Sequence, residues 1–337
     1  MSQFFFRFLI CTLSILVAIV FLMELRMNLL ISVFVGVVAG GTVEFYHERG
    51  SIFNNVTRFH VDVMTPVSAS RVGSDRPLRF LFDTSVTETW IELGYFAEKK
   101  VHNSREFIPR RDKRVGPLPI EIGQGVVGLE SPLVLRHRHE CTFRKAAGVL
   151  GASPLSVFAQ SVQRFTIRYD EERFSMEIGP LSMGGSLGMI VPLVSLVNWD
   201  VDIFLTIPNL IDHSPLVGRI NTGIRGLILP PLVYDGLAQR IESIGGTLRP
   251  QPAFGGSDIL GDCPIASVPD VQMTIGGLTV DIRLAQTLCE TSGDLITHVL
   301  RGDEEHGGVV HLGEDFLQRL VFVHFDLTAN LLVLYSR

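Results

Sequence analysis

The chain has 337 residues, of which 46% are apolar, and a formal net charge of −6. This length leaves room for two lobes or for one large β domain, and the apolar content allows a sizeable core. The negative charge and the lack of a basic stripe with interleaved aromatic residues exclude a nucleic-acid-binding protein. The basic run at 105–114 is interpreted as a solvated loop.

The N-terminal residues 1–43 form a leader with two apolar runs, 8–23 and 29–38, and the second run ends in small residues. Three interpretations are open: a cleaved signal peptide with an upstream extension, an uncleaved signal anchor, or a membrane hairpin. We expect a signal peptide or a signal anchor, which places the protein in the secretory pathway and allows an N-terminal membrane tether. The sequon at Asn55 offers a glycosylation site that fits a lumenal or extracellular chain.

After the leader, short β-rich runs separated by glycine and proline predict a mainly β protein. The clearest strands are 59–63, 165–169 and 201–205, where apolar residues alternate or cluster. Helices are expected at 155–162 and at 232–244, and the second ends at a glycine pair. The expected apolar face of this second helix consists of Leu232, Tyr234, Leu237, Ile241 and Ile244.

The cysteine, histidine and glycine patterns bear on disulfide bridges, metal sites and cofactors. Cys263 and Cys289 flank a strand-rich segment, and we expect them to form a disulfide in an oxidising compartment. His137 and His139 share one side of a predicted strand, but no second ligand pair is evident, so no metal is expected. The glycine-rich stretch 184–188 lacks the lysine and the helix of a phosphate loop, and no cofactor is expected.

An internal repeat divides the chain after the leader. In the first half a strand enters Asp83-Thr84-Ser85, and Gly148-Val149-Leu150-Gly151 follows later. In the second half a strand enters Asn221-Thr222-Gly223, and 309–313 is a similar apolar run that ends in glycine. Two similar halves predict two similar lobes, 44–180 and 181–337, that meet at a cleft.

These motifs resemble the pepsin-like (family A1) aspartic proteases, and the similarity covers most of residues 55–337. Five elements occur in the order of that family, which makes the resemblance specific. They are the run 80–91 around Phe82-Asp83-Thr84-Ser85, the Gly148–Gly151 element, the run from Ile220-Asn221-Thr222-Gly223 to Pro230 and Tyr234, the segment 263–277, and the ending Leu312-Gly313-Glu314-Asp315-Phe316-Leu317 with 323–326.

The resemblance implies a two-lobed, pseudo-symmetric β fold with a hydrolytic site in the cleft, where two aspartates share one proton. Asp83 occupies the first of these positions, and Asn221 occupies the second. An amide forms hydrogen bonds but does not exchange a proton in the range that this mechanism uses. We therefore expect Asp83 to ionise as an ordinary, partly buried acid and the full mechanism to be lost.

Further departures from the family pattern concern the residues around the two acids. Ser85 replaces a glycine, whereas Thr84, Thr222 and Gly223 are kept, so the hydrogen-bonded scaffold is expected to be intact. A flap is expected around 119–129, with Ile122, Gly123 and Gly125 at its tip and no tyrosine hydroxyl. Arg225 either faces solvent or points inward, in which case it lowers the pKa of Asp83.

One further acid, Asp212, precedes the second motif in the sequence. Asp212 lies in a segment that superficially resembles the second motif, but it is too far from Pro230 and Tyr234. We therefore interpret Asp212 as a loop residue and keep Asn221 at the second position.

Three functions follow from these expectations. The first is a pseudoprotease that binds a peptide or protein in its cleft without cutting it. The second is an active aspartic endopeptidase that uses Asp83, and the third is an interaction or inhibitor module that uses outer loops. The resemblance also implies a monomer.

Overall fold

A computed structural model of the chain describes most of the residues after position 40. Among these residues, no helix is both long and apolar enough to cross a bilayer. Residues 1–40 of the leader and Asn55 lie outside the described part. The described ranges are 41–45, 59–64, 77–92, 113–123, 127–136, 146–170, 173–181, 188–251, 256–261, 264–284, 289–291, 294–303 and 308–336.

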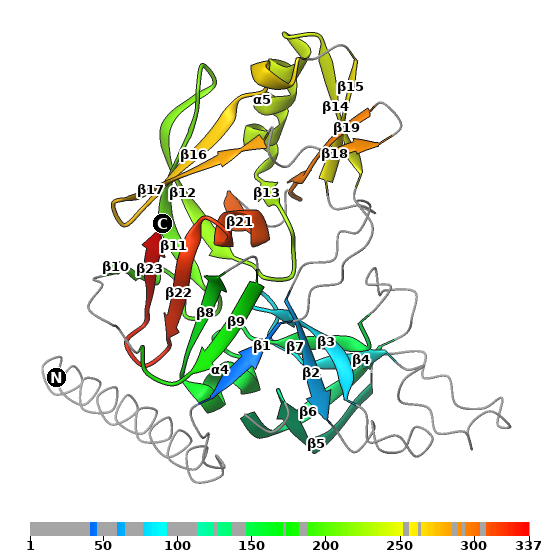
Figure 1. Cartoon of the computed structure of the whole chain (residues 1–337), viewed down its shortest axis with the longest axis vertical. Coiled ribbons are helices and arrows are strands. Elements are labelled where there is room, and N and C mark those ends of the chain that lie inside the picture. Colours follow the sequence, from blue (N-terminus) through cyan, green and yellow to red (C-terminus); the bar gives the residue numbers. More distant parts are fainter. Residues whose placement is uncertain are drawn as a thin grey trace, which may run out of the picture. The chain divides into compact units, whose positions relative to one another are not determined.

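The described part of the chain is built mainly from β-strands, as the sequence predicts (Figure 1). The predicted strands at 59–63, 165–169 and 201–205 are confirmed with shifts of one or two residues at their ends. The helices in these residues are α4 (Val157–Val162), α5 (Pro231–Glu242) and α6 (Glu314–Leu317), with a short 3₁₀ helix at Ile265–Ser267.

Helix α5 begins with Pro231, whose missing N–H group costs nothing in the first turn. Its buried residues are Val233, Tyr234, Leu237 and Ile241. The prediction for Leu232 is wrong, since this side chain is 88% exposed. The buried stripe follows positions three and four apart, and Leu232 lies about 100° away from Val233 around the helix axis.

The first half of the described chain forms a closed barrel. Strand β3, which leads into Asp83, has an almost continuous apolar sequence because its last four residues are buried. The barrel order is β2 (His60–Met64), β3 (Leu78–Asp83), β7 (Gly148–Gly151), β4 (Trp90–Glu92), β6 (Val127–Arg136) and β5 (Lys113–Ile122).

The second half forms a seven-stranded and a four-stranded sheet. The seven-stranded order is β17 (Leu278–Arg283), β16 (Asp270–Ile275), β11 (Asp200–Ile207), β12 (Ile211–Ile220), β21 (Val309–Leu312), β13 (Leu227–Leu229) and β20 (Val299–Arg301). The four-stranded order is β14 (Gly246–Gln251), β15 (Gly256–Gly261), β19 (Asp294–Thr297) and β18 (Cys289–Thr291).

A six-stranded sheet joins strands from both ends of the chain, and β8, β9, β22 and β23 lie side by side in it (Figure 1). Phe165 of β8 stacks on Phe325 of β22 with ring centroids 4.4 Å apart, and Trp199 packs edge-on against both rings. The order is β1 (Thr42–Glu44), β9 (Arg173–Ile178), β8 (Arg164–Asp170), β22 (Leu320–Asp326), β23 (Leu331–Ser336) and β10 (Met189–Pro192).

The strand pairing confirms the internal repeat. In the barrel, the series β2, β3, β7, β4 and β6 is joined by antiparallel, parallel, antiparallel and parallel pairings in turn. In the seven-stranded sheet, β11, β12, β21, β13 and β20 are joined in the same alternation. The second strand of each series leads into a turn motif, so Asp83 and Asn221 occupy equivalent positions.

Candidate functional site

The two turn motifs are joined by a buried hydrogen-bond network between their threonines. The Thr84 N–H donates to Thr222 Oγ1 over 3.0 Å, and the Thr222 N–H donates to Thr84 Oγ1 over 3.1 Å. Each hydroxyl then donates across to the other strand, Thr84 to the Ile220 carbonyl and Thr222 to the Phe82 carbonyl. Both threonines are fully buried, and the scaffold expected from them is present.

This network places the residue before each threonine at the junction of the two motifs. Asp83, the last residue of β3, is 8% exposed, and Asn221, directly after β12, is 4% exposed. Gly223 lies directly against Asp83, because a Cβ atom at Gly223 would be 2.0 Å from Asp83 Oδ2. Only glycine leaves room for the carboxyl group there.

Asp83 receives its hydrogen bonds from Ser85. Its Oδ1 accepts the Ser85 N–H at 2.8 Å and the Ser85 hydroxyl at 2.7 Å. Burial raises the pKa of Asp83 above its ordinary value, and the two bonds from Ser85 oppose this only in part. The Ser85 side chain, which the glycine of the family pattern lacks, therefore points back to the acid and is its hydrogen-bond partner.

The second position holds a fixed amide. Asn221 Oδ1 accepts the Gly223 N–H at 2.9 Å, which identifies the other amide atom as nitrogen. This Nδ2 lies 3.0 Å from His311 Nδ1. Because an amide nitrogen only donates, His311 accepts at Nδ1, so its ring is neutral with the proton on Nε2.

His311 was missed by the sequence analysis, although a signal was present. In the repeat it stands directly before Leu312-Gly313, where the first half has Val149 before Leu150-Gly151. A histidine at a strand position that is apolar in the other copy marks a local change of function. Comparing the two copies residue by residue would have identified it.

The structure bears on two alternatives raised by the sequence. Burial raises the pKa of Asp83 and the bonds from Ser85 oppose it, and Arg225 is not among the causes of this shift. Asp212 is not a loop residue, because it belongs to β12, and that prediction is wrong. It lies near the start of this strand, whereas Asn221 follows its end, so Asp212 does not replace the missing acid.

Ile122 and Gly123, which we expected at the tip of a flap, form the end of the hairpin of β5 and β6. Ile122 is fully buried and is paired with Val63 of β2, and the flap stays a prediction. Val63 is also paired with Leu78, which is the end of β3 farthest from Asp83. The Gly123 N–H donates to the Asp62 carbonyl, so this end closes the barrel.

Several predicted features lie outside the described residues. These are Gly125 at the expected flap tip, the glycosylation site at Asn55 and the side chains of the proposed Cys263–Cys289 disulfide. The backbone of Cys289 begins β18, opposite Ile296 of β19. The disulfide and the glycosylation site stay predictions.

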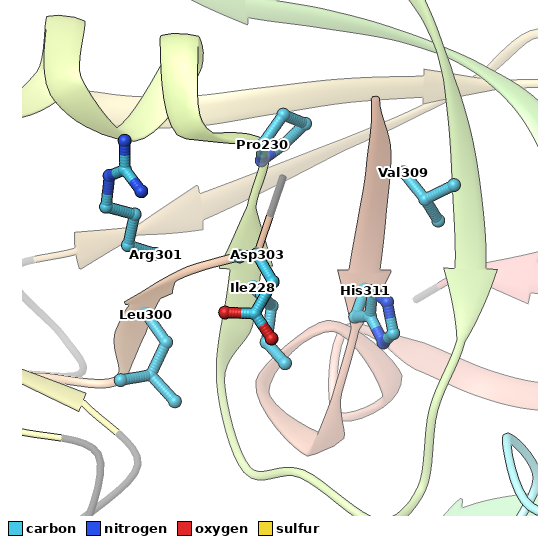
Figure 2. Close-up of a pocket in the computed structure, with 8 residues that line it drawn as sticks. Ile228, Pro230, Leu300, Arg301, Asp303, Val309 and His311 are labelled. Atoms are coloured by element: carbon cyan, nitrogen blue, oxygen red, sulfur yellow. The ribbon is translucent and has the colours of Figure 1, made fainter. Parts of the chain in front are cut away.

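A pocket of about 130 Å³ lies beside His311, among strands β13, β20 and β21 (Figure 2). Arg301 at its edge points toward α5, where it donates two hydrogen bonds to Asp235 at 2.9 and 3.0 Å. This ion pair lowers the pKa of Asp235. The pocket is lined by Ile228, Pro230, Leu300, Arg301, Gly302, Asp303, Val309 and His311.

Comparisons with known proteins identify the fold. No protein-family model matches the sequence, and no curated protein sequence matches it either. The crystal structure of the aspartic proteinase from Irpex lacteus is similar, with a TM-score of 0.61 and 14% sequence identity. The similarity covers 88% of this chain and 97% of that one. The chain therefore has the mainly β, two-lobed fold of the pepsin-like aspartic proteinases.

Proposed function

We propose that the protein is a pseudoprotease that binds an extended peptide or an unfolded protein segment in the cleft between its lobes without cutting it. The observation that carries this proposal is that one of the two equivalent positions holds a carboxyl group, on Asp83, and the other holds a hydrogen-bonded amide, on Asn221. Aspartic-protease chemistry needs two groups that exchange protons in turn, because one takes a proton from water while the other polarises the carbonyl. The amide fills the second position without this capacity.

Binding remains compatible with the site. The threonine network and Gly223 keep the geometry of the two motifs, and Asp83 Oδ2 is the carboxyl oxygen that accepts neither Ser85 bond. A buried acid whose pKa is raised spends more of its time protonated, and a protonated carboxyl group donates to a peptide carbonyl. An extended peptide held by main-chain hydrogen bonds is the ligand class that such a site accommodates.

One observation favours a second candidate, a weakly active endopeptidase. The raised pKa of Asp83 brings this acid closer to the range in which a single group acts as general base, an effect of about 10²–10⁴-fold. The experiment is to incubate the purified protein with an unstructured protein substrate at acidic pH, with and without a pepstatin-type inhibitor. We expect no inhibitor-sensitive cleavage, and robust cleavage that Asp83→Ala abolishes would refute the pseudoprotease.

Binding is tested in parallel by calorimetry with the same inhibitor. We expect heat of binding from the native protein and its loss in Asp83→Ala, with Asp202→Ala on the exposed side of β11 as the matched control. Absence of binding in the native protein would favour the third possibility, an interaction module that uses its outer loops.

The location in the secretory pathway is part of the proposal and rests on the leader sequence at 1–43. N-terminal sequencing of the protein secreted by a eukaryotic host distinguishes a cleaved signal peptide from a retained anchor. Recovery of the intact chain from the cytosolic fraction would contradict this part of the proposal.

A further inference from the structure

The repeated pairing pattern defines one row of side-by-side residues in each half. In the barrel this row is His60, Leu81, Val149, Trp90 and Val134, from β2 to β6. In the seven-stranded sheet it is Asp200, Arg219, His311, Ile228 and Leu300, from β11 to β20. In each row, the residue on the strand that leads into the turn motif lies two positions before the key residue. Leu81 on β3 precedes Asp83, and Arg219 on β12 precedes Asn221.

The two rows differ in chemistry. Leu81, Val149, Trp90 and Val134 are buried and belong to one apolar cluster. In the other row, Arg219 donates two hydrogen bonds to Asp200, at 2.7 and 3.0 Å, and His311 bonds to Asn221. At the second and third places of the row, Arg219 and His311 therefore stand where the first half has Leu81 and Val149, and His311 contacts Asn221.

We propose that His311 is a positioning residue. Its neutral ring accepts a hydrogen bond from the amide of Asn221 and holds this amide in place, and we call these two residues the matched pair. The amide is held at both ends, by the Gly223 N–H at Oδ1 and by His311 at Nδ2. Val149, the counterpart of His311, has no polar atom with which to hold a side chain in this way. This inference deepens the proposed function. Only the test that measures inhibitor binding rests on that function.

The contact between His311 and Asn221 affects what happens when Asn221→Asp restores the second acid. A carboxylate introduced by Asn221→Asp would put oxygen where the amide now donates, opposite the unprotonated Nδ1 of His311. Two acceptors repel, and the imidazole relieves this by taking up a proton and forming an ion pair. Such a pair would keep the new carboxylate ionised and prevent it from sharing a proton with Asp83.

Other charged groups also lie near His311. On β12, Arg219 is engaged by Asp200. On the pocket side, Arg301 is engaged by Asp235, and Asp303 lines the same pocket. The new carboxylate of Asn221→Asp would be the group in direct contact with Nδ1 of the ring, and the proton uptake is predicted from this contact.

The first experiment is nitrogen-15 NMR of the histidine rings, which is independent of activity. In the native protein, His311 should show an unprotonated Nδ1 and a protonated Nε2, and in Asn221→Asp both nitrogens should carry protons at neutral pH. His324, which bonds to Thr166 in the six-stranded sheet, should not change. A protonated Nδ1 on His311 in the native protein, or an unchanged ring in the variant, would overturn the proposal.

The second experiment measures inhibitor-sensitive cleavage of an unstructured substrate by Asn221→Asp alone and combined with His311→Val, the residue of the other half. We expect at least about tenfold more cleavage from the double variant, since only it frees the new acid. Equal cleavage by the two variants would contradict the matched pair. If the native protein itself cleaves, the proposed function fails, whereas the NMR result still decides the role of His311.

The third experiment separates positioning from folding. His311→Gln keeps a side-chain acceptor for Asn221 Nδ2, whereas His311→Val removes it. We expect inhibitor affinity near the native value for the first variant and about three- to tenfold weaker for the second, the range of one lost hydrogen bond. Equal affinity of both folded variants would mean that His311 does not position the amide.

Discussion

At the scale of single residues, the lack of a side chain at Gly223 makes space for the carboxyl group of Asp83. A Cβ atom at this position would overlap Asp83 Oδ2, and the carboxyl group would have to move away. Gly223→Ala should therefore weaken inhibitor binding at least tenfold and destabilise the fold by about 1–3 kcal/mol. Gly128→Ala is the matched control, since nothing lies within 4 Å of its Cβ position. Calorimetry and urea unfolding measure both effects, and native-like values for Gly223→Ala would contradict the packing.

The ionisation of Asp83 makes a second prediction at this scale. Burial raises its pKa in the folded chain, so the protonated form is favoured there. The contribution of Asp83 to stability is thus fully present below the unfolded pKa of 3.8 and is lost as the pH rises through the raised value. Asp83→Asn, which keeps an acceptor for Ser85, should raise the Tm at about pH 7 but not at about pH 3.

Thermal unfolding at the two pH values checks this prediction. Asp202→Asn, on the exposed side of β11, is the control and should leave the Tm unchanged at both. A stabilisation by Asp83→Asn that is as large at about pH 3 as at about pH 7 would contradict the assigned direction of the shift.

At the scale of elements, the hairpin of β5 and β6 closes the barrel. Ile122 is fully buried next to Val63, so Ile122→Ala should leave a cavity and cost about 2–5 kcal/mol of unfolding free energy. Ile190→Ala is the control, because this side chain is 62% exposed and should cost less than about 0.5 kcal/mol. Urea unfolding measures both, and inhibitor affinity should be native-like in both variants. A stable Ile122→Ala protein with altered affinity would favour the flap interpretation.

Some elements are predicted well by the sequence pattern, and others are not. Strand β8 and helix α5 were predicted because their apolar residues recur with the period of a strand or a helix. The hairpin at Ile122 was assigned from a glycine pattern that fits any tight turn. Which face of the barrel a turn meets depends on pairing with β2, a contact between residues distant in sequence.

At the scale of the whole molecule, the threonine network couples the two repeats. Thr84→Val removes a hydroxyl that accepts the Thr222 N–H and donates to the Ile220 carbonyl, leaving two buried groups unpaired. We expect a loss of about 2–5 kcal/mol. Thr274→Val, in the exposed pair with Thr279, is the matched control and should be nearly neutral. Urea unfolding decides, and an equally small effect of both changes would show that the network does not hold the repeats together.

The sequence by itself determined the mainly β class, the repeat, and the identity of the residues at the two key positions, Asp83 and Asn221. Strand periodicity and motif order are local properties of the sequence, and the fold that they predict is shared with a solved structure at 14% identity. The tertiary structure alone decided that Ser85 turns onto Asp83, that Ile122 belongs to the barrel wall, and that His311 holds Asn221. Each of these depends on where a side chain points or on contacts between distant strands, and no periodicity in the sequence encodes such contacts.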